Sequence, residues 1–370
     1  MRIWFISLAL AGLWLAGCTA APTPTLAPTA AVPATAVPSA TAVPATATPS
    51  ATPTAAATAT APAAPTAAAI TAANAASLQP GEPVPAPQIY QMTWTPDSQL
   101  LRVGNKEGLH TIASDGRGEI NFINTQALTG TLSFAQDGTL AALQDLHTVR
   151  LYAPETLQPQ QTIADFGTAT NIILAPDAGK LAVQSADNIA VTLYDLPGGQ
   201  PAATLTGFET AAPVYGVQFD ANWQTMIWIA RATVQLMDVD SGQLGPRFEH
   251  EDFVGALALS PDGRILATAT SATLNGQFTP IIKFWNAQSG DAIATLPQPA
   301  LITSLAFSPD GALLAAGTTD GNILFWDVQA QTMITTLDAP VEQVRQLAFS
   351  PDGRFLATAD QEVILWHVPA

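Results

Sequence analysis

Residues 305–317 read LAFSPDGALLAAG, and this stretch decides the fold because close copies of it recur along the chain. Two plain copies are LALSPDGRILATA at 257–269 and LAFSPDGRFLATA at 347–359. Four weaker copies precede them: MTWTPDSQLLRVG from Met92, LSFAQDGTLAALQ from Leu132, IILAPDAGKLAVQ from Ile172 and VQFDANWQTMIWI from Val217. Their turn residues recur every 40 to 48 positions, at Asp97, Asp137, Asp177, Asn222, Asp262, Asp310 and Asp352. Repeats of this length are typical of folds in which each copy forms one structural unit.

Each copy predicts short antiparallel strands joined by tight turns. In the turn SPDG, Pro presets φ, Asp bonds the local backbone and Gly accepts a positive φ. A third strand follows and ends in an aromatic–polar pair, as in Trp326-Asp327, Trp285-Asn286, Trp366-His367 and Tyr194-Asp195. The strands are apolar on both faces, which indicates packing on both sides, as in a blade between two other blades.

The last copy supplies only three strands, which predicts how the ring of blades closes. An unpaired outer edge invites association with other chains, and closed folds avoid it. We therefore expect residues 77–84, which precede the first copy, to form the outer strand of blade seven against residues 363–368. Pro80 and Pro83 are compatible with this position because an outermost strand has one side without partners.

The repeats resemble the WD-repeat family, most closely in the last three copies, where the period and the terminal Trp326-Asp327 match the family pattern. The resemblance implies an all-β fold, a seven-bladed β-propeller, over residues 70–370. In many members a His, a Ser or Thr, an Asp and the Trp form hydrogen bonds across each blade. Here only His250 occupies the His position, and the Asp residues occur without a matching His, at Asp145, Asp187, Asp320 and Asp360. We therefore expect the blades to depend mainly on apolar packing, with His250 as a structural residue.

The N-terminal residues have the features of an export signal. Met1 and Arg2 precede an apolar run at 3–15, which is shorter than the roughly 20 residues that a membrane-spanning helix needs. The run ends in LAGC and resembles a bacterial lipobox, which implies a signal peptide over 1–17 and acylation of Cys18. The alternative is an ordinary cleaved signal. Lipidation would hold the protein on the outer face of the cell membrane, or on an outer membrane where two membranes are present.

Residues 18–69 predict a disordered linker, because after Cys18 they are almost entirely Ala, Thr, Pro, Val and Ser. Pro removes backbone donors, and so little apolar bulk cannot form a core. The rest of the chain carries the negative charge, with 29 Asp and Glu against 12 Lys and Arg overall. Such a balance disfavours nucleic acid as a partner.

The sequence contains no pattern that predicts catalysis. Its single cysteine excludes a disulfide within one chain. The four histidines fall at scattered positions without metal-ligand spacing: His110, His147, His250 and His367. We expect no enzyme activity, no catalytic residue, no metal and no cofactor. Two alternatives stay open: a propeller enzyme or cofactor protein of the quinoprotein or lyase kind, and a structural surface protein without a specific ligand.

The candidate binding residues lie where the innermost strands are predicted to begin. The position two before each repeat holds Tyr90, Gly130, Thr170, Tyr215, Gly255, Thr303 and Arg345. Tyr and Arg are enriched in binding hot spots. Blade five adds an insertion at 270–280, predicted as a long loop with Asn275, Gly276 and Phe278 at its tip. We expect Tyr90, Tyr215, Arg345 and Phe278 to bind an unknown protein or envelope component, with the propeller itself monomeric.

Overall fold

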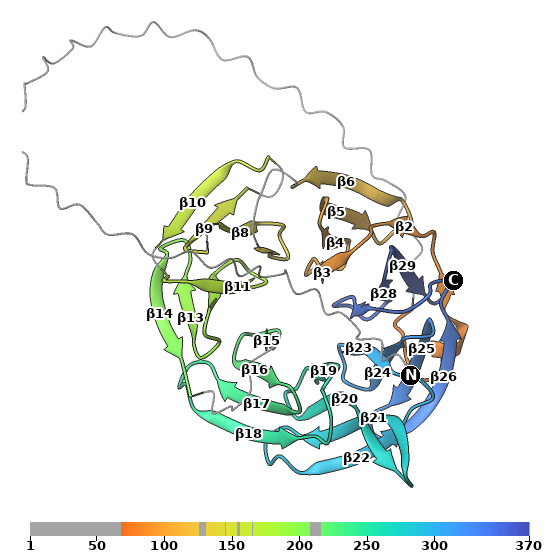
Figure 1. Ribbon diagram of the computed structural model, residues 1–370. Coiled ribbons are helices and arrows are strands. Elements are labelled where there is room, and N and C mark those ends of the chain that lie inside the picture. Colours follow the sequence, from red (N-terminus) through yellow and green to blue (C-terminus); the bar gives the residue numbers. More distant parts are fainter. Residues whose placement is uncertain are drawn as a thin grey trace, which may run out of the picture. The chain divides into compact units, whose positions relative to one another are not determined.

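The computed structural model describes residues 68–369, apart from 126–130, 145, 154–155, 165 and 208–215. Within these residues the strands form seven antiparallel sheets, arranged as blades around a ring (Figure 1). This confirms the predicted all-β, seven-bladed propeller. No helix among the described residues is long and apolar enough to cross a membrane. The predicted signal peptide, Cys18 and the linker up to residue 67 lie outside the described residues.

Six blades share one strand order, from the innermost strand to the outermost. In blade one these strands are β3 (Ile89–Trp94), β4 (Leu100–Asn105), β5 (Gly108–Ala113) and β6 (Gly118–Asn124). Blades two and three contain β7 (Thr131–Phe134), β8 (Leu140–Gln144), β9 (Thr148–Tyr152), β10 (Pro159–Ala164), β11 (Ala169–Leu174), β12 (Lys180–Ser185), β13 (Val191–Asp195) and β14 (Gln200–Leu205). Blades four and five contain β15 (Gly216–Phe219), β16 (Thr225–Ala230), β17 (Thr233–Asp238), β18 (Leu244–Glu249), β19 (Ala256–Leu259), β20 (Ile265–Leu274), β21 (Gln277–Asn286) and β22 (Ala292–Pro297).

Blade six contains β23 (Ile302–Phe307), β24 (Leu313–Thr318), β25 (Asn322–Asp327) and β26 (Thr332–Asp338), and its first turn shows why SPDG recurs. Ser308 Oγ donates to Asp310 Oδ1 at 2.5 Å and accepts from Leu313 N at 2.9 Å. Gly311 takes a positive φ of 71°, which favours glycine. The same Ser–Asp bond closes the corresponding turns of blades five and seven.

The core lies between neighbouring blades, as strands with two apolar faces predict. On β24, Leu313 and Ala315 pack in one cluster with Leu356 and Ile364 of blade seven. The alternating residues Leu314 and Ala316 pack in another cluster that includes blade five. Successive side chains of one strand therefore join two different blades.

Blade seven is completed by the N-terminal part of the described chain. Its inner strands are β27 (Gln346–Phe349), β28 (Phe355–Ala359) and β29 (Glu362–His367). Two short strands pair antiparallel with β29: β1 (Gln79–Pro80) and β2 (Val84–Pro85). This confirms the predicted closure of the ring by a proline-containing outer strand. The strand is interrupted where the expectation was a continuous 77–84.

The segment before β1 is packed rather than extended. Residues Ala75–Ser77 form a short 3₁₀ helix, η1, so the outer strand begins at Gln79 and not at Ser77. Ile70 N donates to Gly353 O at 2.8 Å, and the Ile70 side chain is buried in the cluster of blades six and seven. The N-terminal segment thus contributes apolar packing as well as strand pairing.

Candidate functional site

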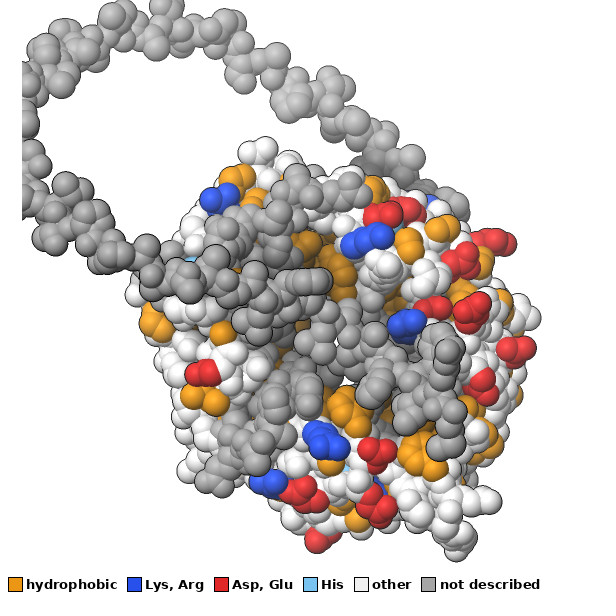
Figure 2. Space-filling model, in the orientation of Figure 1, with side chains coloured by type: hydrophobic (Ala, Val, Ile, Leu, Met, Phe, Trp, Pro, Cys, Tyr) orange, Lys and Arg blue, Asp and Glu red, His pale blue; other side chains and the backbone are white. Residues whose placement is uncertain are grey.

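The two ends of the ring carry different turns. Each innermost strand begins at one end and reaches its SPDG-type turn at the other, and the second strand then returns to the first end. We call the end with the starts of the inner strands the hairpin rim, and the opposite end the SPDG rim. Acidic side chains are spread over several blades on the face drawn in Figure 2.

The insertion in blade five is an ordered hairpin on the hairpin rim, so its prediction as a long loop is wrong. Strands β20 and β21 remain paired out to Leu274 and Gln277. Beyond Ala269, no other described strand pairs with β20 on its other side, because β19 begins at Ala256 opposite Ala269. The turn is Asn275-Gly276, with φ values of 51° and 77°. Two positive φ values and the sequence Asn-Gly are typical of the tight turn that joins two strands directly.

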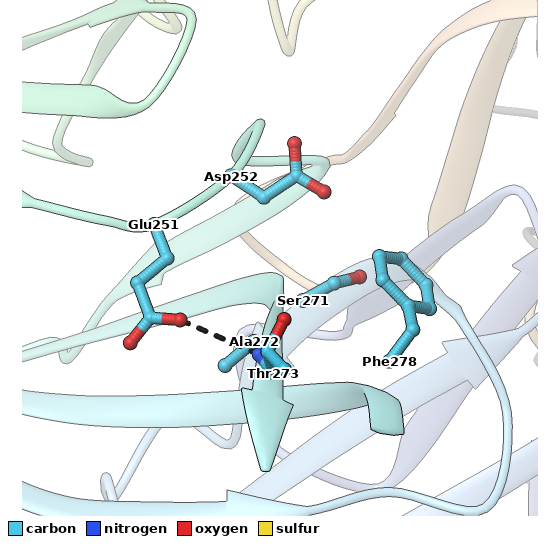
Figure 3. Close-up of a pocket in the computed structure, with 6 residues that line it drawn as sticks. All are labelled: Glu251, Asp252, Ser271, Ala272, Thr273 and Phe278. Carbon is cyan, nitrogen blue, oxygen red and sulfur yellow. Dashed lines mark hydrogen bonds between the residues drawn. The ribbon is translucent and has the colours of Figure 1, made fainter. Parts of the chain in front are cut away.

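Phe278 stands near the tip of this hairpin with 64% of its surface exposed. It lines a pocket with Ala272 and with polar side chains from two elements (Figure 3). Ser271 and Thr273 come from β20, whereas Glu251 and Asp252 come from the loop between β18 and β19. Glu251 Oε2 accepts from Thr273 N at 3.4 Å, the bond drawn in Figure 3.

A buried hydrogen-bond chain holds the start of that loop. Trp285 Nε1 donates to Thr268 Oγ1 at 2.8 Å, and Thr268 Oγ1 lies 2.8 Å from His250 Nε2. His250 Nδ1 lies 3.2 Å from Ala232 O. Burial lowers the pKa of His250 to about 4, so the ring is neutral near pH 7. A neutral ring with its proton on Nδ1 satisfies the whole chain, which confirms His250 as a structural residue.

Thr270 fixes the next part of the same loop. Its Oγ1 lies 3.1 Å from Asp252 O and 3.0 Å from Phe253 O. The loop is thus bonded to the blade on both sides of Glu251. The carboxylates of Glu251 and Asp252 form no ion pair within the part of the chain that the structure describes.

Tyr90 lies on β3 at the hairpin rim, with 43% of its surface exposed. Surrounding protein nevertheless desolvates its hydroxyl and raises the pKa of Tyr90 to about 12. The phenol is therefore neutral near pH 7. A Cβ added at Gly104 would come within 2.5 Å of Phe134 and 3.0 Å of Tyr90, so the glycine leaves room for both rings.

Arg345 has a structural partner that the sequence did not reveal. Its Nε donates to Asp360 Oδ1 at 2.6 Å, and Asp360 is only 5% exposed. The guanidinium thus neutralises a buried carboxylate beside the turn between β28 and β29. Its side chain still has half of its surface exposed. Gln346 Nε2 donates to Ile89 O at 3.3 Å, which links the start of β27, directly after Arg345, to the start of β3, which carries Tyr90.

The predicted binding residues are only partly assembled. Tyr90 and Arg345 lie on neighbouring blades, whereas Phe278 lies on blade five, with blade six between. Tyr215 and Gly130 lie outside the described residues. Sequence reasoning missed Glu251, Asp252 and Ser271. The adjacent Glu251-Asp252 pair was the available signal in the sequence, but only the fold brings β20 and its insertion against that loop.

The described histidines do not form a common site. His110 lies on β5, His147 between β8 and β9, His250 before β19 and His367 on β29, so each belongs to a different blade. Nowhere in 68–369, outside the gaps noted above, do three or more His, Cys, Asp or Glu side chains gather as they would to hold a metal ion.

Comparison with known families agrees with the architecture. Residues 243–275, 290–327 and 331–367 match the family described as WD domain, G-beta repeat. Each match begins at the outer strand of one blade and continues into the next, so the family repeat is offset from the blade by one strand. No curated protein matches the chain. Three WD repeats thus match this family model in blades five to seven, and together with the four preceding blades they form a seven-bladed β-propeller.

Proposed function

We propose that this protein is a binding scaffold that presents the hairpin rim of its propeller to a protein partner outside the cytoplasm. The observation that carries the proposal is Phe278, which is 64% exposed near the tip of a two-stranded hairpin. An aromatic ring held away from the core supplies contact area that soluble proteins otherwise bury. The pocket beside it adds polar groups that can select a partner.

The rigidity of the hairpin supports binding rather than a passive surface. Its strands stay in register from Ile265 opposite Asn286 to Leu274 opposite Gln277. A contact residue on a paired strand loses less conformational freedom on binding than one on a flexible loop. The tight Asn275-Gly276 turn and the paired strands therefore fix the backbone at Phe278 before a partner binds.

We propose binding without catalysis, because the most perturbed histidine has no nitrogen left for chemistry. His250 faces Thr268 through Nε2 and Ala232 through Nδ1. Its low pKa follows from burial within the blade, where it holds the loop.

The proposed location depends on the N-terminal sequence. A lipid on Cys18 and the linker after it would display the propeller away from a membrane. Incorporation of labelled palmitate into the wild-type chain, and its loss in Cys18→Ser, is the expected result. Equal release of both proteins into the medium would contradict the anchor.

Site-specific photo-crosslinking in cells that make the full chain tests the binding face. A photo-crosslinking amino acid is placed at position 278 on the hairpin rim or at position 99, an exposed position in the first turn of the SPDG rim. We expect a discrete adduct with one protein from position 278 and none from position 99. Adducts from position 99 alone would place the partner on the other rim, and no adduct from either would contradict the proposal.

A further inference from the structure

We infer that the blade-five pocket accepts a basic side chain, lysine or arginine, from the partner protein. The inference rests on the proposed function and names the chemistry of the contact. Its three parts meet at one place (Figure 3): two carboxylates without an ion pair among the described residues, an aromatic wall, and the hydroxyl of the nearly buried Ser271.

The carboxylates provide the charge. Glu251 and Asp252 both line the pocket and are exposed, and neither is matched by a cation within the described residues. Some other exposed carboxylates do have such a partner: Glu249 pairs with Arg247 at 2.5 Å, and Asp195 pairs with Lys180 at 3.0 Å. An ionised carboxylate only accepts hydrogen bonds, and a cationic N–H group is its strongest donor.

Phe278 provides a wall that suits an organic cation. Its ring faces the pocket beside Ala272, which is buried at the base. Lysine and arginine carry an apolar stem below the charge, and this stem packs against apolar groups. The face of an aromatic ring also attracts the charged head.

Ser271 points to a ligand independently of the charges. It is only 5% exposed, and its hydroxyl lines the pocket without a hydrogen-bond partner in the part of the chain that the structure describes. In Figure 3 its oxygen lies between the acidic loop and Phe278. The hydroxyl oxygen is open to the pocket and can accept a hydrogen bond, so an N–H donor that enters the pocket has an acceptor there.

The same groups are less suited to a metal ion. Calcium takes six to eight oxygen ligands, whereas Ala272 and Phe278 make one side of this pocket apolar. A divalent cation is therefore the competing outcome that the experiment must separate.

The test uses the full chain and a fluorescent, amidated peptide of four arginines, with a peptide of four citrullines as its neutral match. Binding is measured by anisotropy at physiological salt. We expect Glu251→Gln with Asp252→Asn to weaken arginine-peptide binding roughly tenfold, because directed charge-assisted bonds are lost. Phe278→Leu should weaken it roughly threefold, because the apolar wall remains and only the ring face is lost.

The matched control is Asp240→Asn with Glu342→Gln, which removes the same charge at exposed positions away from the pocket. We expect this control to change the affinity less than about twofold, since distant surface charges act only through a screened field. Equal losses in both double variants would overturn the inference. So would equal binding of the citrulline peptide, or displacement of the arginine peptide by micromolar calcium.

The outcome separates this inference from the proposed function. If the crosslink from position 278 persists in the double variant Glu251→Gln with Asp252→Asn, the proposed binding face stands and the inference about the pocket fails. If the arginine peptide binds tightly but no crosslink forms in cells, the inference about the pocket stands and the proposed scaffold function fails.

Discussion

Blades five and six hold the same tryptophan position in different ways. In blade five, Trp285, Thr268 and His250 form a continuous hydrogen-bond chain. In blade six, Leu314 pairs with Trp326 as Leu266 pairs with Trp285, so Ala316 stands where Thr268 would be. Gln298 takes the place of His250: its N donates to Pro280 O as His250 N donates to Ala232 O. Among the described residues, Trp326 Nε1 and Gln298 Oε1 have no hydrogen-bond partner.

The difference shows that a blade of this protein does not need the polar chain in order to form. Blade six pairs its strands as regularly as blade five and is buried on both sides. Blade seven is intermediate, since Trp366 Nε1 donates to Thr358 Oγ1 at 3.0 Å but Ala339 occupies the His position. Of these three blades, only blade five has the complete hydrogen-bond chain, and it lies beside the loop that carries Glu251 and Asp252. We conclude that the main role of this hydrogen-bond chain is to fix that loop next to the hairpin.

The largest expected effect comes from interrupting the hydrogen-bond chain of blade five. Thr268→Val keeps the shape but leaves Trp285 Nε1 and His250 Nε2 without a hydrogen-bond partner. We expect a loss of about 3 kcal/mol in the free energy of unfolding, since each unsatisfied buried group costs about 1–3 kcal/mol. The control Thr358→Val in blade seven removes one bond and should cost about 1 kcal/mol. Denaturant unfolding of both variants measures the two losses in free energy. Equal losses would contradict the continuous hydrogen-bond chain in blade five.

The pH dependence of stability gives the next largest effect. The pKa of His250 is lowered from 6.5 to about 4 in the folded protein, so the unfolded chain binds the proton more readily between these values. The contribution of neutral His250 is complete above pH 6.5 and is lost as pH falls toward 4. We expect about 2 kcal/mol of this loss between pH 7 and pH 5.

His250→Gln, which copies blade six, is the control for that measurement. Glutamine does not titrate, so the variant should lose about 2 kcal/mol less than the wild type between pH 7 and pH 5. Parallel pH profiles for the two proteins would show that His250 is not held neutral by burial.

The smallest expected effect is a gain in stability from a substitution in blade six. Ala316→Thr supplies the hydroxyl that blade five has, and it can accept from Trp326 and donate to Gln298. We expect stability to rise by roughly 1 kcal/mol, the net value of a typical buried hydrogen bond. Thermal unfolding measures the change against Ala316→Val, which adds similar bulk without the hydroxyl. A gain in the valine variant alone would show that the site lacks volume and not a polar partner.

The sequence predicted the blades well because each blade is specified locally. Ser308, Asp310 and Gly311 form their turn within a few residues, so the motif alone indicates it. The closure was predictable from a different signal, because the last repeat has only three strands and its outer strand had to come from another part of the chain. The hairpin was misjudged because Asn275-Gly276 was interpreted as the tip of a loop, although Asn-Gly between pairing strands favours a hairpin.

The site was harder to predict because it depends on contacts between separate segments. Asp252 and Ser271 become neighbours only when the loop after β18 packs against β20. Arg345 was predicted from its residue type and position, yet its bond to Asp360 is set by the register of blade seven. Exposure and pairing of charged side chains follow from the assembled ring, and the repeat pattern does not encode them.

Hydrogen exchange of the full chain, measured by mass spectrometry for the wild type and Thr268→Val, tests the central claim most directly. Val254 N and His250 N are bonded to Arg231 O and Ala232 O, so this loop should be protected in the wild type. We predict that Thr268→Val speeds exchange in peptides covering 250–255 and leaves peptides covering 298–302 of blade six unchanged. Equal acceleration in both peptides, or none in 250–255, would contradict the claim that the blade-five chain serves the loop of the candidate site.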